Sequence, residues 1–282
     1  MAAEILIALR SPVSAWLIAE PFRREPLYAG AALCLAALVP ATVFAMSIDE
    51  RTLHAVNVWL KPLRFEVALA TYCATLAWLA GWLPQDVTSA RWHRIFAASV
   101  VLAAVAEMTW IGGAAAFGVA SHFNESTPVM SIIYKIMGGL AVLLTSPALV
   151  YGIVILRHGE SGLDSTFRLS IGIGLLLTFI LTVIVAGYVA NGPSHLVGGN
   201  ESDAEGAPLM GWARDGGDLR VAHFFATHSM HFIPAFGFAA SMLLPPYAGR
   251  MAVVAFSVVF TALVGYAFAE ALMGRPFLPM LL

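Results

Sequence analysis

The stretch "RLSIGIGLLLTFILTVIVAGYVA" (168–190) decides the fold, because no charged side chain follows its first residue. A helix that crosses the hydrocarbon core of a bilayer needs about 20 predominantly apolar residues. A strand of a membrane barrel needs only about 10 residues, and their polarity alternates. This stretch is far longer than a strand and does not alternate, so it predicts a membrane-spanning helix.

Six further apolar stretches have the same character, and they cover residues 27–47, 57–83, 94–119, 128–156, 221–244 and 249–273. Proline supports several of their ends: Pro128 opens one stretch, and Pro245 with Pro246 separates the last two. Pro147 and Pro234 lie inside stretches and are expected to kink them. The sequence therefore predicts an all-α integral membrane protein, a seven-helix bundle.

The composition agrees with lipid as the main solvent, since 60% of the 282 residues are hydrophobic and only 11% are charged. A soluble domain carries about 25% charged residues. The net charge of −2 and the lack of a basic stretch argue against a nucleic-acid partner. The two cysteines, Cys34 and Cys73, form neither a disulfide framework nor a metal motif.

We expect two parts, an N-terminal segment at 1–26 and a seven-helix domain at 27–282 with a long outer loop at 191–220. The apolar residues of the first segment share one helical face, which predicts a short interfacial helix; the alternative is a frayed polar tail. Basic residues of the short loops all fall on one side, which predicts a cytoplasmic N-terminus and an external C-terminus. These residues are Arg10, Arg23, Arg24, Arg91, Arg94, Arg157, Arg168 and Arg250.

Polar side chains gather at the opposite, outer side. Lys61, Arg64 and Glu66 open the second span there, and most histidines fall at outer span ends or in outer loops. An ionisable group inside the bilayer costs about 2.5–3.5 kcal/mol, so such groups are expected to face the bundle interior and to pair. Glu107 with Lys135 is one candidate pair.

Three histidines in "DLRVAHFFATHSMHF" (218–232) are the strongest functional signal. His228 and His231 are three residues apart and share a helical face, whereas His223 turns away from them. Alternatively, the kink at Pro234 turns all three towards one place. A catalytic metal site needs about three protein ligands, and a bis-histidine haem needs two imidazoles. The ligand pool comprises His122, His195, His223, His228 and His231.

Cationic and acidic residues near this pool have expected roles of their own. Lys61, Arg64 and Arg220 are candidates for binding haem propionates or an anionic headgroup. Asp218 is expected to fix an imidazole tautomer by accepting its free N–H. In a hydrolase, Asp218 or Glu66 would serve as the base.

Three motifs carry a resemblance: "WLKPLRFEVALATYCATLAWL" (59–79), "SHFNESTP" (121–128) and "GDLRVAHFFATH" (217–228). They resemble a widespread group of bacterial polytopic membrane proteins, over about residues 55–245. The resemblance implies a bacterial inner (plasma) membrane location and adds Asn124 to the cofactor-binding residues. It also marks His231 as a departure, because glutamine is usual there, so this histidine is not expected to be an essential ligand.

These observations predict a protein that binds haem b or a single transition metal (Fe, Cu or Zn) near the outer face. Its expected function is electron transfer or oxidation of a lipid-soluble partner such as a quinol. Three alternatives remain open: a zinc-dependent membrane hydrolase of lipid amide or ester bonds, a transporter, and a structural or assembly subunit.

Overall fold

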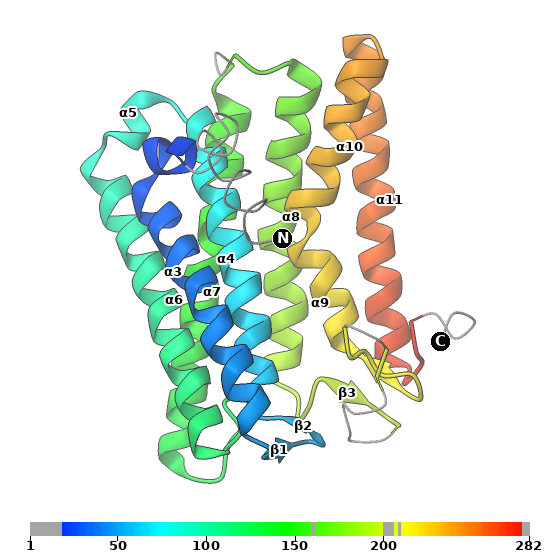
Figure 1. Ribbon diagram of the computed structural model, residues 1–282. Helices are drawn as coiled ribbons and strands as arrows, with labels where there is room; N and C mark the ends of the chain where they lie inside the picture. Colours follow the sequence, from blue (N-terminus) through cyan, green and yellow to red (C-terminus); the bar gives the residue numbers. More distant parts are fainter. Residues whose placement is uncertain (1–18, 160–161, 200–205, 208–209, 278–282) are drawn as a thin grey trace, which may run out of the picture.

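The computed structural model describes residues 19–159, 162–199, 206–207 and 210–277, and it is a bundle of roughly parallel and antiparallel helices (Figure 1). The all-α prediction is confirmed. The interfacial helix expected within 1–26 lies largely outside the described residues, which begin at position 19 in this region.

Within the described residues, six helical segments are long and apolar enough to cross a membrane. They are α3 (Pro26–Ile48), α4 (Leu60–Leu79) with its 3₁₀ extension η1 (Ala80–Trp82), α6 (Arg91–Phe117), α7 (Pro128–Arg157), α8 (Ser165–Ala190) and α11 (Pro246–Leu272). A short helix, α5 (Gln85–Thr88), precedes α6. Each long segment begins and ends within a few residues of an expected span, and capping residues or prolines mark several of the ends. One example is the Thr127 side chain, which accepts a hydrogen bond from the Met130 N–H.

The remaining expected span, 221–244, is not one helix. It consists of α9 (Leu219–Thr227) and α10 (Ser229–Leu243), which meet at His228. Figure 1 shows them stacked end to end between α8 and α11. Neither piece alone is long enough to cross a membrane, so the sixth expected span in chain order consists of two short helices in tandem.

The position of this break differs from the expectation that Pro234 would kink the span. α10 continues through Pro234, and the break lies further towards the N-terminus, where the Met230 N–H leaves the helical pattern. The Thr178 hydroxyl of α8 accepts that N–H at 2.8 Å and lies 3.5 Å from the Thr227 carbonyl. A threonine of a neighbouring helix thus replaces the hydrogen bonds that the break removes. α7 likewise continues as one helix through Pro147.

α8 lies at the centre of the packing, against α7 on one side and α9, α10 and α11 on the other. Gly174 permits the close approach of α10, because a methyl group there would lie 2.9 Å from the Ser229 carbonyl oxygen and from Pro234 Cδ. Two buried apolar cores result. One joins α3, α4, α6, α7 and α8, and the other joins α8 to α9, α10 and α11.

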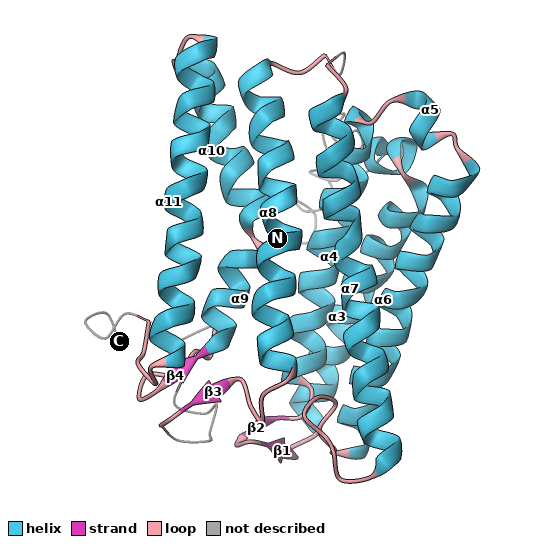
Figure 2. Ribbon diagram, turned by 180° about the vertical axis from the view of Figure 1, so that it is seen from behind, coloured by secondary structure: helices cyan, strands magenta, loops and turns pink. Residues whose placement is uncertain are grey.

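Two small antiparallel hairpins lie at the same end of the bundle (Figure 2). The first pairs β1 (Thr52–Leu53) with β2 (Val56–Asn57), and the second pairs β3 (Leu196–Val197) with β4 (Gly217–Asp218). The second hairpin brings the two ends of the long outer loop together at the start of α9. The end of the bundle that is expected to face outward therefore carries both hairpins.

The opposite end carries the basic side chains of the short loops. α6, α8 and α11 begin there, and α7 ends there. Arg91, Arg157, Arg168 and Arg250 therefore lie at one end, as the sequence predicts, and this asymmetry is what the positive-inside rule associates with the cytoplasm.

Candidate functional site

A chain of polar contacts crosses the break between α9 and α10. The Nδ1 atoms of His228 and His231 are 3.1 Å apart, and His231 Nε2 lies 3.0 Å from the Thr75 hydroxyl of α4. The two rings lie on the same side of the helix, as their spacing predicts. The chain links α10 to α4, and thus joins the two halves of the bundle.

The Thr75 hydroxyl determines which ring nitrogens of His231 and His228 carry protons when both imidazoles are neutral. It donates its only proton to the Thr71 carbonyl at 2.8 Å, so it accepts the Nε2–H of His231. The Nδ1 of His231 then carries a lone pair and accepts a hydrogen bond from the Nδ1–H of His228. The remaining lone pair belongs to His228 Nε2, and it is available to a proton or to a metal ion.

Aromatic rings and a further imidazole surround His228. The ring of Phe224 lies 4.3 Å from the His228 ring between centroids, and Trp212 of the outer loop packs against Phe224 at 5.5 Å. His223 Nδ1 is buried and has no hydrogen-bond partner among the described residues. A buried polar atom without a partner is costly, so this nitrogen marks a place where a ligand or water is expected.

Asp218 and Arg220 are committed to the entrance of α9. Asp218 caps the helix by accepting the Arg220 N–H, and both its oxygens accept from the Arg220 guanidinium at 2.7–3.1 Å. It also accepts the Ala213 N–H. These bonds give Asp218 a structural role, and no bond to a histidine ring is formed within the described part of the chain.

Arg64 and Arg220 approach each other beneath the outer loop. The Arg220 guanidinium donates to the Gly211 carbonyl at 2.8 Å, and a methyl group at Gly211 would lie 2.7 Å from an Arg64 amino group. Two of the three expected cations therefore meet the same loop residue, next to the mouth of α9.

His122 belongs to a second, aromatic cluster between α4 and α7. Its ring lies 5.9 Å from the rings of Phe65 and Tyr134. Phe123 connects Tyr134 to His195, with centroid distances of 5.7 and 6.2 Å. Aromatic rings thus connect His122 with His195. This cluster is separate from the pair formed by His228 and His231.

Burial governs the protonation of His122, which lies in the loop between α6 and α7. Desolvation and the nearby Lys61 ammonium lower the pKa of this imidazole to about 3. The Ser121 hydroxyl lies 3.1 Å from its Nδ1. His122 is therefore neutral near pH 7.

Two buried carboxyl groups lie among the spans. Glu66 accepts a 2.6 Å hydrogen bond from the Thr42 hydroxyl, while its second oxygen has no partner among the described residues. One oxygen of Glu107 is likewise without a hydrogen-bond partner in that part of the chain. The expected pair of Glu107 with Lys135 is not formed, because Lys135 is exposed on α7 and the cation that acts on Glu107 is Lys61 of α4.

Asn124 shapes the turn before α7. Its amide donates to the Ala120 carbonyl, and its oxygen accepts from the backbone and hydroxyl of Ser126. Among the described residues, no three histidine, cysteine or acidic side chains lie close enough to hold one metal ion. The histidine pool therefore forms two clusters in this structure.

Three threonines contribute contacts that the sequence did not predict. Thr42, Thr75 and Thr178 lie within apolar spans, and each bonds to a group on another helix. Hydroxyls inside otherwise apolar spans were the signal that could have identified them.

A comparison of the chain with models of known protein families, with curated proteins and with solved structures found no match. The geometry of the site is therefore the basis of the functional argument.

Proposed function

We propose that the protein is a membrane redox protein that binds haem b through His228 and exchanges electrons with a lipid-soluble partner such as a quinol. The contact that carries the proposal is the chain from His228 through His231 to Thr75. A histidine that binds iron almost always donates its other ring N–H to a fixed acceptor, which orients the ring and raises its basicity. His231 is such an acceptor for His228.

The surroundings of His228 fit a flat apolar cofactor. Phe224 packs on the imidazole, and the unpartnered His223 nitrogen lies one and a half turns towards the outer end of α9. Arg64 at that end has the charge that a propionate requires, whereas Arg220 is already paired with Asp218. Bound haem supplies one-electron chemistry, and the protein supplies the ligand, its orientation and apolar walls. A second imidazole that would hold the haem would come from the remaining pool of His122, His195 and His223.

A single metal ion is the alternative occupant of the same contact. Two imidazole nitrogens bound to one ion at about 2.0–2.1 Å lie roughly 3 to 3.4 Å apart. The observed 3.1 Å between the Nδ1 atoms of His228 and His231 matches this spacing. A catalytic site needs about three protein ligands, and the described residues offer no group of three. Haem b can be held by one or two imidazoles, so it is preferred, and a zinc hydrolase has less support.

The visible spectrum and metal content of the protein, purified in detergent, test this proposal. We expect a Soret band that shifts on reduction with dithionite, and about one iron per chain. A colourless protein with about one copper or zinc per chain would replace haem by the two-imidazole metal site. A colourless protein without metal after expression with added haem and metals would refute both.

The break in the sixth span favours transport as a second candidate. Transporters commonly bind their substrates or coupling ions where short helices meet inside the membrane. Here the break carries histidines, and Glu66 of α4 and Glu107 of α6 each have a buried oxygen without a hydrogen-bond partner among the described residues. Intramembrane acids and histidines are typical of proton relays.

Proton movement into proteoliposomes tests this second candidate. We expect a transporter to acidify the lumen when a pH gradient or a substrate is applied, and Glu66→Gln to abolish the change. Glu125→Gln, in the loop before α7, is the matched control. Equal proton flux through empty vesicles and through vesicles that contain the protein would remove transport from consideration.

A further inference from the structure

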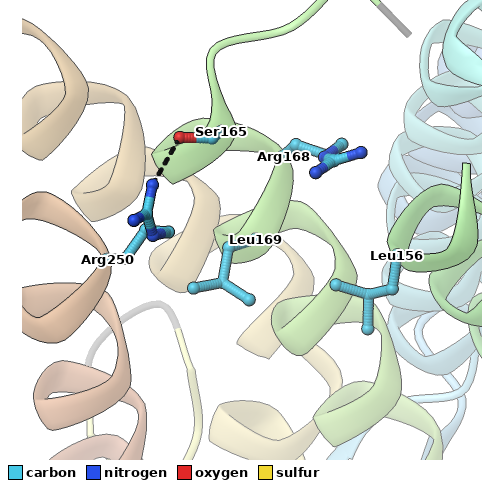
Figure 3. A pocket seen from close by; sticks show the side chains of 5 residues that line it. All are labelled: Leu156, Ser165, Arg168, Leu169 and Arg250. Atoms are coloured by element: carbon cyan, nitrogen blue, oxygen red, sulfur yellow. Dashed lines mark hydrogen bonds between the residues drawn. The ribbon is translucent and has the colours of Figure 1, made fainter. Parts of the chain in front are cut away.

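A cleft of about 240 Å³ opens between α7, α8 and α11, at the basic end of the bundle and opposite the end where α9 begins. Its lining consists of Leu156, Ser165, Arg168, Leu169 and Arg250. Figure 3 shows Arg250 joined to Ser165 at the start of α8, with Leu169 below them and Arg168 on the other side. The cleft therefore combines two cations with an apolar floor.

The two guanidinium groups retain capacity for a ligand. Arg250 donates to the Ser165 hydroxyl at 3.0 Å, and Arg168 donates to the His158 carbonyl at 2.9 Å. A guanidinium has five N–H donors, so each retains several. Among the described residues, neither arginine lies within ion-pair distance of a carboxylate. An anion in the cleft would compensate both charges.

The location of the cleft indicates which anion. α7 ends at Arg157, while α8 and α11 begin at Ser165 and Pro246, so the cleft lies at the level where spans meet the headgroup region. The leucine side chains lie within the spans, on the side of the arginines that faces the bilayer core. A phosphodiester fits the arginines, and the acyl chains attached to it fit the leucines.

We propose that this cleft binds the phosphate of an anionic phospholipid, such as phosphatidylglycerol, whose acyl chains lie along Leu156 and Leu169. The site is independent of the histidine clusters. Basic pockets between spanning helices bind anionic headgroups in this way, and each arginine near the membrane surface strengthens such binding about fivefold. Bidentate donation from a fixed guanidinium adds selectivity for phosphate.

The test is native mass spectrometry of the delipidated full chain with phosphatidylglycerol or phosphatidylcholine in mixed micelles. We expect one tightly bound phosphatidylglycerol, and a loss of affinity of about thirtyfold in the double variant Arg168→Gln/Arg250→Gln. Phosphatidylcholine should bind at the level of the double variant.

Two control variants separate charge from local structure. Ser165→Ala removes the partner of Arg250 but leaves both cations, so it should retain most of the affinity. Arg91→Gln removes an exposed cation at the same end of the bundle and should bind as the wild type does. Equal binding of phosphatidylglycerol by the double variant and by the wild type would overturn the proposal. So would displacement of the lipid by millimolar inorganic phosphate, because the site would then recognise a free anion.

Discussion

Replacement of Thr178 by valine tests how the break between α9 and α10 is held. The threonine is 2% exposed, and its hydroxyl accepts the Met230 N–H at 2.8 Å. Valine has nearly the same shape, so the change removes the hydroxyl without leaving a large cavity. The Met230 N–H would then be buried without an acceptor.

The expected cost follows from that one donor. An unsatisfied buried donor costs about 1–3 kcal/mol, and hydrogen bonds between membrane helices average about 0.6 with a maximum of about 1.7 kcal/mol. The second contact, to the Thr227 carbonyl, is long at 3.5 Å and adds little. We therefore expect Thr178→Val to lower the free energy of unfolding by about 1–2 kcal/mol.

Chemical unfolding in detergent micelles measures the difference, and hydrogen exchange locates it. The Met230 amide should lose about tenfold in protection, which corresponds to about 1.4 kcal/mol. Thr178→Ser retains the hydroxyl and should keep that protection. If valine left both the unfolding free energy and the Met230 protection at wild-type values, the break would not depend on this bond.

Three further predictions concern other parts of the molecule. His231→Gln should keep the cofactor spectrum, because a glutamine carbonyl can accept the N–H of His228, whereas His231→Leu should lose it; loss with both would mean that His231 is itself a ligand. Burial holds the pKa of His122 near 3, against about 6.5 in the unfolded chain. Its contribution to the free energy of unfolding is therefore complete above pH 6.5, and it falls by at most about 1.4 kcal/mol per pH unit between pH 6.5 and pH 3. The pH dependence of unfolding should differ between the wild type and His122→Gln in that window, and parallel curves would contradict the assignment. Ala55→Gly should stabilise the protein by about 1 kcal/mol, because Ala55 has φ 63° in the tight turn of the first hairpin, where glycine is unstrained; a lower melting temperature would oppose this.

Most of the fold could be predicted from the sequence because each span is a long apolar run, and several spans have capping residues or prolines at their ends. Thr127 and Pro128 mark the start of α7, and the structure begins it there. The break in the sixth span was not predicted. Pro234 suggested a kink at its own position, whereas the hydroxyl that accepts the Met230 N–H belongs to Thr178 on another helix. Hydrogen bonds between spans depend on how the helices pack, and the residue pattern of a single span does not predict that packing.

The candidate site shows the same division. The spacing of His228 and His231 predicts their shared face, and the structure brings their rings to 3.1 Å. The partner of Glu107 was wrong in the sequence analysis, since Lys135 lies on the exposed surface of α7 and Lys61 acts on Glu107 instead. Depth in the membrane is readable from residue number, but the rotation of each helix is set by its neighbours.

Chemical rescue of His228 tests the central claim most directly. His228→Gly should abolish the reduced-minus-oxidised spectrum of the purified protein, and added imidazole should restore it, because a free imidazole can occupy the vacated space beside His231 and Phe224. His54→Gly, in the turn of the first hairpin, is the matched control and should keep the spectrum unchanged. A wild-type spectrum in His228→Gly without imidazole would contradict the assignment of this histidine as the ligand.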